Sequence, residues 1–305
     1  MIPARRLVLS GGGIKVVSIV GALKVLEEKK RLGSLKEVCG VSAGAWLGFM
    51  MAGGLSIGSI EKLVLDLDFG LIRNITPDAF LGFPETFGLD DGSKLVKFLE
   101  SIMRVVMKVD PAITFAGLEK LRTSKGRKIT FRCWATDMNT SRGREFSFLK
   151  SPSVKIIDAL HASMAIPLYF VPVIDPETGH LLSDGGIQGA LPLHYLTDDE
   201  CQETLGIGFC RSKPVPENGE APGDLMAFVN SIFSSLVHSR HENVLRKWSH
   251  IVLRIPVDEV ASWNFEAGRD VRQDLLTKGA KATREWLLTH TSMRQGVVPE
   301  RRYSV

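Results

Sequence analysis

The sequence predicts an α/β fold in which a mostly parallel sheet is covered by helices on both faces. Two observations from the first 52 residues support this prediction. Short apolar runs at residues 7–9 and 37–40 each lead into glycines, and a segment with helical spacing of apolar residues follows each run. This strand–helix–strand–helix order is typical of a parallel sheet whose crossover helices bury both of its faces.

The elements follow in chain order. After the run 7–9 and the glycines at 11–13, apolar residues recur at helical spacing from Ile14 to Leu26. The run 37–40 leads into an apolar helix over 43–52. The later predicted segments are an irregular stretch (72–89), an amphipathic helix (95–106), a short helix (115–121), a strand (128–136), a helix (156–165), a turn between extended segments (175–179), a helix (225–237), a strand (251–255) and a final helix (270–290).

We expect one domain over residues 1–305, because no internal repeat or long linker is visible. Residues 70–125, which contain scattered phenylalanines and prolines, form a candidate helical insertion or cover. The Pro/Gly/Glu-rich stretch 214–223 is the only plausible internal break and is expected to be a surface loop. Residues 224–305 then complete the domain with helices and a strand.

Composition excludes several classes of protein. The chain has 305 residues, 44% hydrophobic and 24% charged, which excludes a disordered or low-complexity chain. Its net charge of +4 is too small to indicate nucleic-acid binding. The four cysteines follow no pairing or metal-binding pattern, and no signal-peptide pattern is visible, so we expect reduced thiols in a cytoplasmic protein.

One stretch has the length of a membrane span. Residues 38–60 carry no charge, and glycines recur there at the spacing of a membrane-helix dimer face. The same stretch holds six glycines and three serines, which favours a buried strand, a tight turn and a short packed helix. We therefore expect no transmembrane helix.

The sharpest local motif is Gly40-Val41-Ser42-Ala43-Gly44. A serine between a strand and a helix takes a strained conformation that turns its hydroxyl outward, and small neighbours let the chain close around it. The N-terminus of the following helix also favours the negative charge that develops during attack on an ester. This pattern makes Ser42 a candidate nucleophile.

The glycine run Gly11-Gly12-Gly13 occupies the equivalent position after the first strand. Bare backbone amides in such a loop suit an oxyanion or a phosphate. Val16 stands where a dinucleotide fingerprint needs its third glycine, and no P-loop lysine follows, so both nucleotide motifs are excluded.

A base for Ser42 is less obvious from the residues alone. Among the seven histidines, His161, His180 and His194 are candidates, but none has a distinctive local context. Asp184-Gly185-Gly186 follows a strand-like segment, and its glycines let the carboxylate reach another loop. Taken alone, this tripeptide is more often a plain turn.

Taken together and in this order, the motifs resemble the patatin-like phospholipase family. The likeness covers residues 6–208 well and fades through the C-terminal third. The segments that carry it are Gly11-Gly12-Gly13-Ile14-Lys15, Gly40-Val41-Ser42-Ala43-Gly44, Asp184-Gly185-Gly186, and the intervening residues 114–118, 135–138 and 158–173.

The resemblance implies a three-layer α/β/α sandwich and a Ser–Asp dyad. It assigns Ser42 as nucleophile, Asp184 as general base, and the amides of Gly11, Gly12 and Gly13 as oxyanion hole. Lys15, Gly40, Ala43, Gly44, Gly185 and Gly186 support these motifs. The implied reaction transfers an acyl group from a glycerolipid or phospholipid to Ser42 and then to water, in peripheral contact with a membrane surface. It needs no calcium, metal or other cofactor.

Three features set limits on this interpretation. A free aspartate, with a pKa of about 3.9, is a weak base for a hydroxyl, so a dry site must compensate. The family usually has glycine where this chain has Val16, which we expect to narrow the mouth of the oxyanion loop. It often has asparagine where this chain has Ala190, so we expect a positioning hydrogen bond to be lost.

Alternatives stay open at this point. If Val16 has spoiled catalysis, the chain is a lipid-binding protein on the same fold; if an alcohol replaces water as acceptor, it is an acyltransferase. The residues Phe80, Phe83 and Phe87 form a candidate cover or lipid-contacting segment, with ordinary core packing as an equal alternative.

Overall fold

The computed structural model describes residues 4–123, 125–210, 243–257 and 266–292, together with the isolated residues 221, 223, 228, 231, 232, 235 and 264. The loop predicted over 214–223 and the helix predicted over 225–237 therefore lie outside the described residues, apart from a few single positions.

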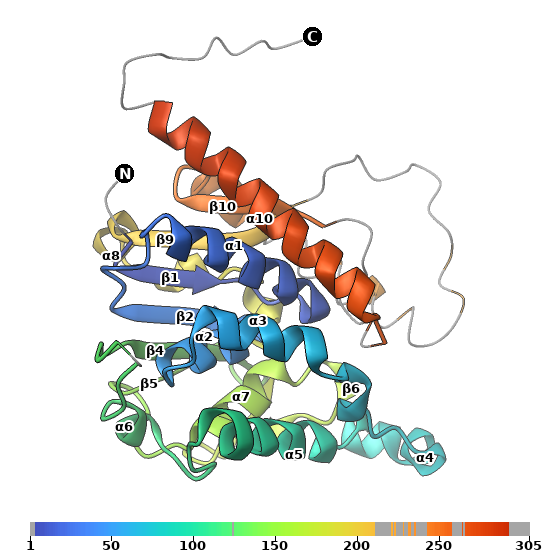
Figure 1. The fold of residues 1–305 in the computed structure, drawn as a ribbon. Helices are drawn as coiled ribbons and strands as arrows, with labels where there is room; N and C mark the ends of the chain where they lie inside the picture. Colours follow the sequence, from blue (N-terminus) through green and yellow to red (C-terminus); the bar gives the residue numbers. More distant parts are fainter. Residues whose placement is uncertain are drawn as a thin grey trace.

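A central sheet of eight strands runs through the described part of the chain, in the order β10-β9-β1-β2-β4-β8-β7, with β5 also paired to β4 (Figure 1). The pairs among β10, β9, β1, β2 and β4 are parallel, whereas β5, β7 and β8 pair antiparallel. The strands are β1 Arg6–Leu9, β2 Glu37–Val41, β4 Thr130–Asp137, β5 Arg142–Ser147, β7 Val173–Ile174, β8 Leu181–Ser183, β9 Thr204–Cys210 and β10 Val252–Pro256.

Helices complete an α/β/α sandwich, so the predicted fold class is confirmed (Figure 1). The α-helices that lie within the described residues are α1 Val16–Glu28, α2 Ala43–Ala52, α3 Ile57–Asp66, α4 Pro77–Thr86, α5 Ser93–Ser101, α6 Phe115–Leu118, α7 Ile156–Met164, α8 Asp198–Gln202 and α10 Arg269–Ser292. The short helical turns are η1 Gly13–Lys15, η2 Phe69–Ile72, the π-helix η3 Ile102–Met107, η4 Gly185–Gln188 and η5 Pro192–Tyr195.

The two faces of the sheet bury different clusters, as alternating side chains of a strand require. In β1, the side chains of Leu7 and Leu9 join the large core under α1, α2 and α10, whereas Val8 joins a smaller cluster with residues of η5 and α8. All three side chains are fully buried. This burial on both faces explains why the first strand is a continuous apolar run rather than an alternating one.

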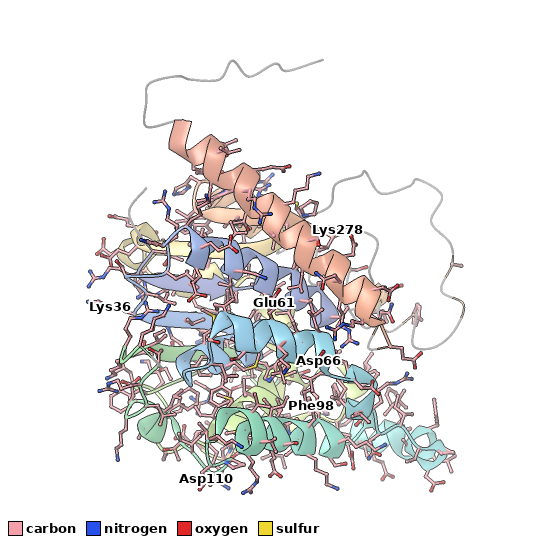
Figure 2. All side chains as sticks on the ribbon, in the orientation of Figure 1. Lys36, Glu61, Asp66, Phe98, Asp110 and Lys278 are labelled. Atoms are coloured by element: carbon pink, nitrogen blue, oxygen red, sulfur yellow. The ribbon has the colours of Figure 1, made fainter. Side chains whose placement is uncertain are left out.

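Charged side chains on the outer surface connect the helices of one layer (Figure 2). Lys24 of α1 forms an ion pair of 2.8 Å with Glu61 of α3, and Arg269 of α10 pairs with Asp66 of α3. These pairs are partly exposed, so each contributes at most about 1 kcal/mol. No helix among the described residues has both the length and the apolar character needed to cross a bilayer.

The segment 72–89 differs from its prediction as an irregular stretch. It contains α4 and the short strand β3 (Gly88–Asp90), which pairs in parallel with β6 (Leu168–Phe170) in a separate two-stranded sheet. Pro77 favours a helix there because it occupies the first turn, where proline's missing amide is not needed. Phe80 and Phe87 are each 53% exposed, so core packing does not account for them, whereas Phe83 is partly buried.

Candidate active site

Strands β2 and β8 run toward each other along one edge of β4. Val41, the last residue of β2, pairs with Trp134, and Ser183, the last residue of β8, pairs with Thr136. Because β5 occupies the other edge of β4 at the same positions, β2 and β8 must share one edge. Their ends therefore meet at this edge, and the residue that follows each strand comes to the same place: Ser42 and Asp184.

Ser42 lies at a strained turn between β2 and α2. Its φ of 52° and ψ of −133° are rare for a residue other than glycine. A Cβ added to Gly40 would lie 2.6 Å from the backbone of Gly44, and one added to Gly44 would lie 2.5 Å from the carbonyl oxygen of Leu9. The chain closes so tightly around Ser42 that only glycine fits at the positions two residues before and two residues after it, as the sequence motif predicted.

The backbone amide of Ser42 is held by a second serine. It donates a hydrogen bond of 2.9 Å to Oγ of Ser163 in α7, and this hydroxyl donates one of 2.7 Å to the carbonyl oxygen of Trp134. Ser163 is fully buried. Sequence reasoning did not assign Ser163 a role, since the only signal was its place in the family-like segment 158–173.

Asp184 is 1% exposed and held from several sides. Its Oδ1 accepts 2.7 Å from the amide of Gly186, its own amide donates 2.7 Å to the carbonyl of Ala165, and its carbonyl accepts 2.8 Å from Oγ1 of Thr136. A Cβ on Gly185 would lie 2.2 Å from a main-chain oxygen of β4, so this neighbour must also be glycine. These contacts fix the carboxyl group at the end of β8.

The environment of Asp184 makes it a far better base than an ordinary aspartate. Burial raises its pKa from 3.8 to about 7, although hydrogen bonding to the Ser42 side chain and the Gly186 amide lowers it. Its Oδ2 has no hydrogen bond of regular geometry to any described residue. The Ser42 hydroxyl is therefore close enough to affect this carboxyl group, but in a contact looser than a regular hydrogen bond, as is common before substrate binds.

The glycine loop lies directly against Ser42. A Cβ on Gly11 would be 3.0 Å from Cβ of Ser42. The Gly11 amide donates 2.8 Å to the carbonyl oxygen of Ala190, whereas the amides of Gly12 and Gly13 have no hydrogen bond to a described residue. Two of the three predicted donors are thus free, and Gly11 instead anchors the loop. The Ala190 backbone performs this anchoring, which needs no side chain.

Two further loop residues have ordinary surroundings. Val16 begins α1 with φ −56° and ψ −24°, a helical conformation that valine adopts without strain. It is buried, and its side chain lines the wall of the pocket described next, together with Gly13. Lys15 ends η1, and its carbonyl accepts 2.8 Å from the Ser18 hydroxyl.

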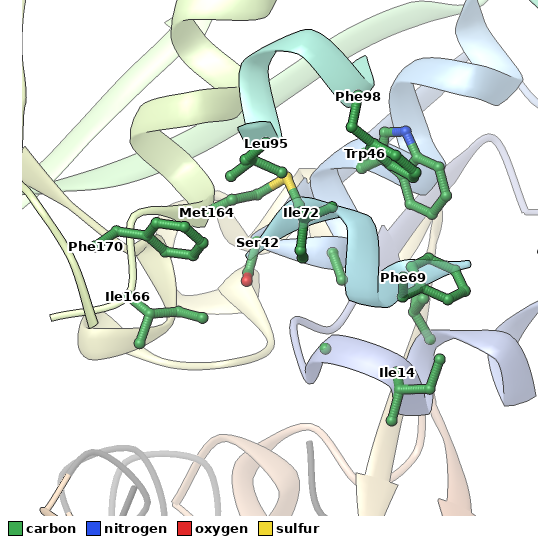
Figure 3. Close-up of a pocket in the computed structure, with 13 residues that line it drawn as sticks. Ile14, Ser42, Trp46, Phe69, Ile72, Leu95, Phe98, Met164, Ile166 and Phe170 are labelled. Carbon is green, nitrogen blue, oxygen red and sulfur yellow. The ribbon is translucent and has the colours of Figure 1, made fainter. Parts of the chain in front are cut away.

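An apolar pocket opens at Ser42 (Figure 3). The empty space within it, part of which is open to solvent, amounts to about 550 Å³. Met164, Ile166 and Phe170 lie around the Ser42 hydroxyl, and the rings of Trp46, Phe69 and Phe98 lie farther along (Figure 3). The residues that line it are Gly13, Ile14, Val16, Ser42, Ala43, Trp46, Phe69, Ile72, Leu95, Phe98, Met164, Ile166 and Phe170.

None of the three candidate histidines lines this pocket. Burial lowers the pKa of His161, and its Nε2 abuts Gly92 at the start of α5. His194 packs against Tyr195 with ring centroids 4.0 Å apart. His180 is paired with Asp137 at 2.8 Å, in a network beyond β8.

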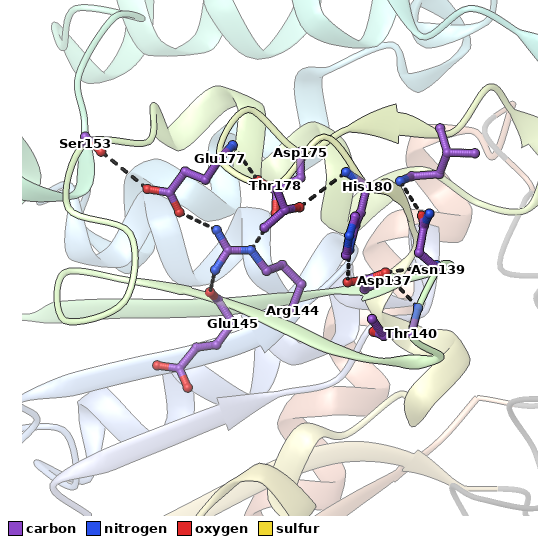
Figure 4. A network of polar contacts seen from close by, with 11 residues as sticks. Asp137, Asn139, Thr140, Arg144, Glu145, Ser153, Asp175, Glu177, Thr178 and His180 are labelled. Atoms are coloured by element: carbon purple, nitrogen blue, oxygen red, sulfur yellow. Dashed lines mark hydrogen bonds and ion pairs between the residues drawn. The ribbon is translucent and has the colours of Figure 1, made fainter.

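That network holds the β7–β8 hairpin in place (Figure 4). Beside the His180–Asp137 pair, the amide of Leu181 donates 2.9 Å to the side chain of Asn139. Arg144 of β5 forms an ion pair of 2.7 Å with the buried Asp175. These contacts anchor both ends of the turn that precedes β8, and so they position the strand that carries Asp184.

Comparisons with known proteins found a matching family and related chains. The patatin-like phospholipase family matches residues 7–197. An uncharacterized protein of Acanthamoeba polyphaga mimivirus is 27% identical over 93% of this chain and 94% of its own length. A probable lipid hydrolase of Invertebrate iridescent virus 6 is 26% identical over 62% of each chain.

A solved structure shares the fold. VipD from Legionella pneumophila is similar with a TM-score of 0.63 and 18% identity, over 94% of this chain and 67% of VipD. At this identity the likeness concerns the fold.

Proposed function

The chain belongs to the patatin-like phospholipase family, and from this membership we propose that it hydrolyses carboxylic esters of glycerolipids, as a phospholipase A or lysophospholipase. One observation carries the proposal: the strained Ser42 lines an apolar pocket, and the buried Asp184 lies beside it at the same edge of β4. A nucleophile and a base at the end of a space suited to an acyl chain are what lipid ester hydrolysis requires.

In the first step, Oγ of Ser42 attacks the ester carbonyl carbon and its proton passes to Oδ2 of Asp184. The pKa of about 7 lets Asp184 accept this proton near neutral pH. The carbonyl oxygen becomes an oxyanion, for which the free amides of Gly12 and Gly13 and the N-terminus of α2 are the proposed donors. Asp184 then returns the proton to the departing alcohol, leaving an acyl group on Ser42.

In the second step, water attacks the acyl-enzyme carbonyl and Asp184 accepts its proton. Collapse of the intermediate breaks the bond to Oγ of Ser42, the proton returns to that oxygen, and the fatty acid leaves. The apolar side chains that line the pocket, such as Met164 and Phe98, hold the acyl chain and exclude bulk water from it.

Labelling with an alkyl fluorophosphonate tests the proposal without a choice of lipid. We expect one adduct on Ser42, read by intact mass and peptide mapping, and none in Ser42→Ala. Asp184→Asn is expected to slow labelling and ester hydrolysis about 10²- to 10⁴-fold, the range for loss of a general base. Asp90→Asn is the matched control, because Asp90 is also fully buried but accepts its hydrogen bonds from the backbone amides of Asn74 and Gly92 rather than from Ser42.

The outcomes separate the alternatives. Normal hydrolysis by Ser42→Ala or Asp184→Asn contradicts the dyad. A chain that binds lipid but neither labels nor releases fatty acid is a lipid-binding protein. If an added alcohol takes up the acyl group in place of water, the chain is an acyltransferase.

A further inference from the structure

Helix α4 exposes apolar side chains that no other described part of the chain covers. None of its ten residues is buried. Phe80 is 53% and Leu81 84% exposed, and the flanking residues Leu71 and Phe87 are 63% and 53% exposed. Figure 1 shows α4 projecting at the lower right, outside the helices that cover the sheet.

This helix lacks the usual sources of helical stability. Isolated helices shorter than about 12 residues are marginal in water, and most helices in proteins are stabilised by packing a buried apolar face. Helix α4 has ten residues, an internal proline (Pro84) and no buried face. Its phenylalanines and Leu81 therefore have no function in the core, and contact with another apolar phase would stabilise them.

The exposed segment is continuous with the wall of the active-site pocket. In η2, which precedes α4, Phe69 and Ile72 line the pocket, while Leu71 between them faces outward. Only residues 73–76 lie between this turn and α4, so the pocket wall and the exposed helix are neighbouring segments of the chain. On the other side of α4 in the sequence, α5 also lines the pocket, through Leu95 and Phe98.

Basic side chains accompany this apolar surface. Residues 93–108, which comprise α5 and η3, carry four basic residues and one acidic residue. Their basic residues are all exposed: Lys94, Lys97, Arg104 and Lys108. In the sequence, an exposed apolar helix is thus followed by exposed cations, and a lipid surface offers a partner to each: a hydrocarbon interior below anionic phosphates.

We propose that residues 69–87, here called the docking segment, bind the surface of a phospholipid bilayer, with Phe80, Leu81 and Phe87 inserted and the basic residues of 93–108 at the phosphates. This inference rests on the proposed function, since it brings the pocket of Ser42 to its lipid. Helix α4 also carries the exposed acidic residues Asp78 and Glu85, so apolar insertion supplies most of the binding.

Vesicle cosedimentation with Ser42→Ala tests docking independently of catalysis. Vesicles of phosphatidylcholine with one-fifth phosphatidylglycerol are expected to bind this variant. Adding Phe80→Ser and Leu81→Ser should weaken binding at least tenfold, because two exposed side chains lose their insertion. The matched control is Phe148→Ser with Leu149→Ser, a second pair of neighbours that are 43% and 85% exposed. Thermal unfolding checks that each variant folds.

Each result decides the matter. Binding that falls only in the Phe80/Leu81 variant supports the docking segment. Equal loss in both pairs, or no vesicle binding by a chain that still hydrolyses a dissolved ester through Ser42, overturns docking and leaves the proposed function standing. Docking through α4 by a chain inert toward every ester supports the docking segment and refutes the proposed function. If the Phe80/Leu81 change abolishes self-association instead of vesicle binding, the surface belongs to a second copy of the chain.

Discussion

Two regions of the molecule differ in how far their side chains are buried. One is the edge of β4 beside Ser42 and Asp184, and the other is the docking segment of residues 69–87. At the edge, every residue is enclosed: Ser42 and Asp184 are 8% and 1% exposed, and neighbouring glycines leave no room for a methyl group. In α4 no residue is buried. Steric enclosure fixes residue identity in the first region, whereas the second constrains only apolar character, and this contrast predicts different responses to the same substitution.

The largest expected difference comes from replacing a glycine by alanine in each region. In Gly44→Ala, the new methyl group meets the carbonyl oxygens of Leu9 and Ser10 at 2.5 and 2.6 Å. We expect a loss of about 3 kcal/mol or more of unfolding free energy, which outweighs the gain of roughly 1 kcal/mol in helix propensity. Chemical denaturation measures the net change in unfolding free energy.

Gly82→Ala in α4 is the matched control. The nearest atom to its new methyl group is Cγ2 of Thr86, at 3.8 Å. This change should be neutral or stabilise the chain by up to about 1 kcal/mol. If Gly44→Ala lowers the unfolding free energy no more than Gly82→Ala does, the result contradicts the steric enclosure of Ser42.

The second prediction concerns pH at the enclosed edge. The pKa of Asp184 is raised from 3.8 to about 7 by burial, so the folded chain holds this proton more tightly than the unfolded chain does. Stability from this group is complete below about pH 4 and is lost as pH rises through 7. We expect kcat/KM to rise with pH to a plateau above pH 7, where Asp184 is the ionised base.

Asp184→Asn separates the two effects. It should lower activity at every pH, and its Tm should exceed that of the wild-type chain at pH 8 by more than it does near pH 5. Differential scanning calorimetry at both pH values checks this trend. A Tm difference that shrinks as pH rises would contradict the raised pKa.

The same contrast explains what the sequence could predict. The strand–helix order was predictable from the apolar pattern. The turn at Ser42 was predictable because Gly40 and Gly44 approach the backbone so closely that no other residue fits there. The prediction of Asp184 needed three motifs in order, because Ser42, which follows β2, is 142 positions away in the chain and only the register along β4 brings the two residues together.

Other features could not be predicted from local pattern. The spacing of Phe80 and Phe87 is the same for a buried helix and an exposed one, and only the fold shows that α4 covers no core. The Gly11 amide looked like an oxyanion donor, but the carbonyl of Ala190 takes its hydrogen bond. A hydrogen bond between residues so far apart in the chain cannot be predicted from the residues that neighbour either of them in the sequence.

The smallest expected effect on activity comes from Ser163, which contacts the backbone of Ser42. Its hydroxyl accepts from the Ser42 amide at 2.9 Å and donates to the carbonyl of Trp134, so it holds the strained turn without touching substrate. Ser163→Ala leaves the Ser42 amide unpaired, and the turn relaxes. We expect kcat to fall roughly tenfold, about 1.4 kcal/mol of activation free energy, with KM little changed. Thr283→Val removes an equally buried hydroxyl that donates to the carbonyl oxygen of Gly279 within α10, so it should cost similar stability and leave kcat unaltered. A parallel fall of kcat in both variants would assign Ser163 to general stability rather than to positioning Ser42.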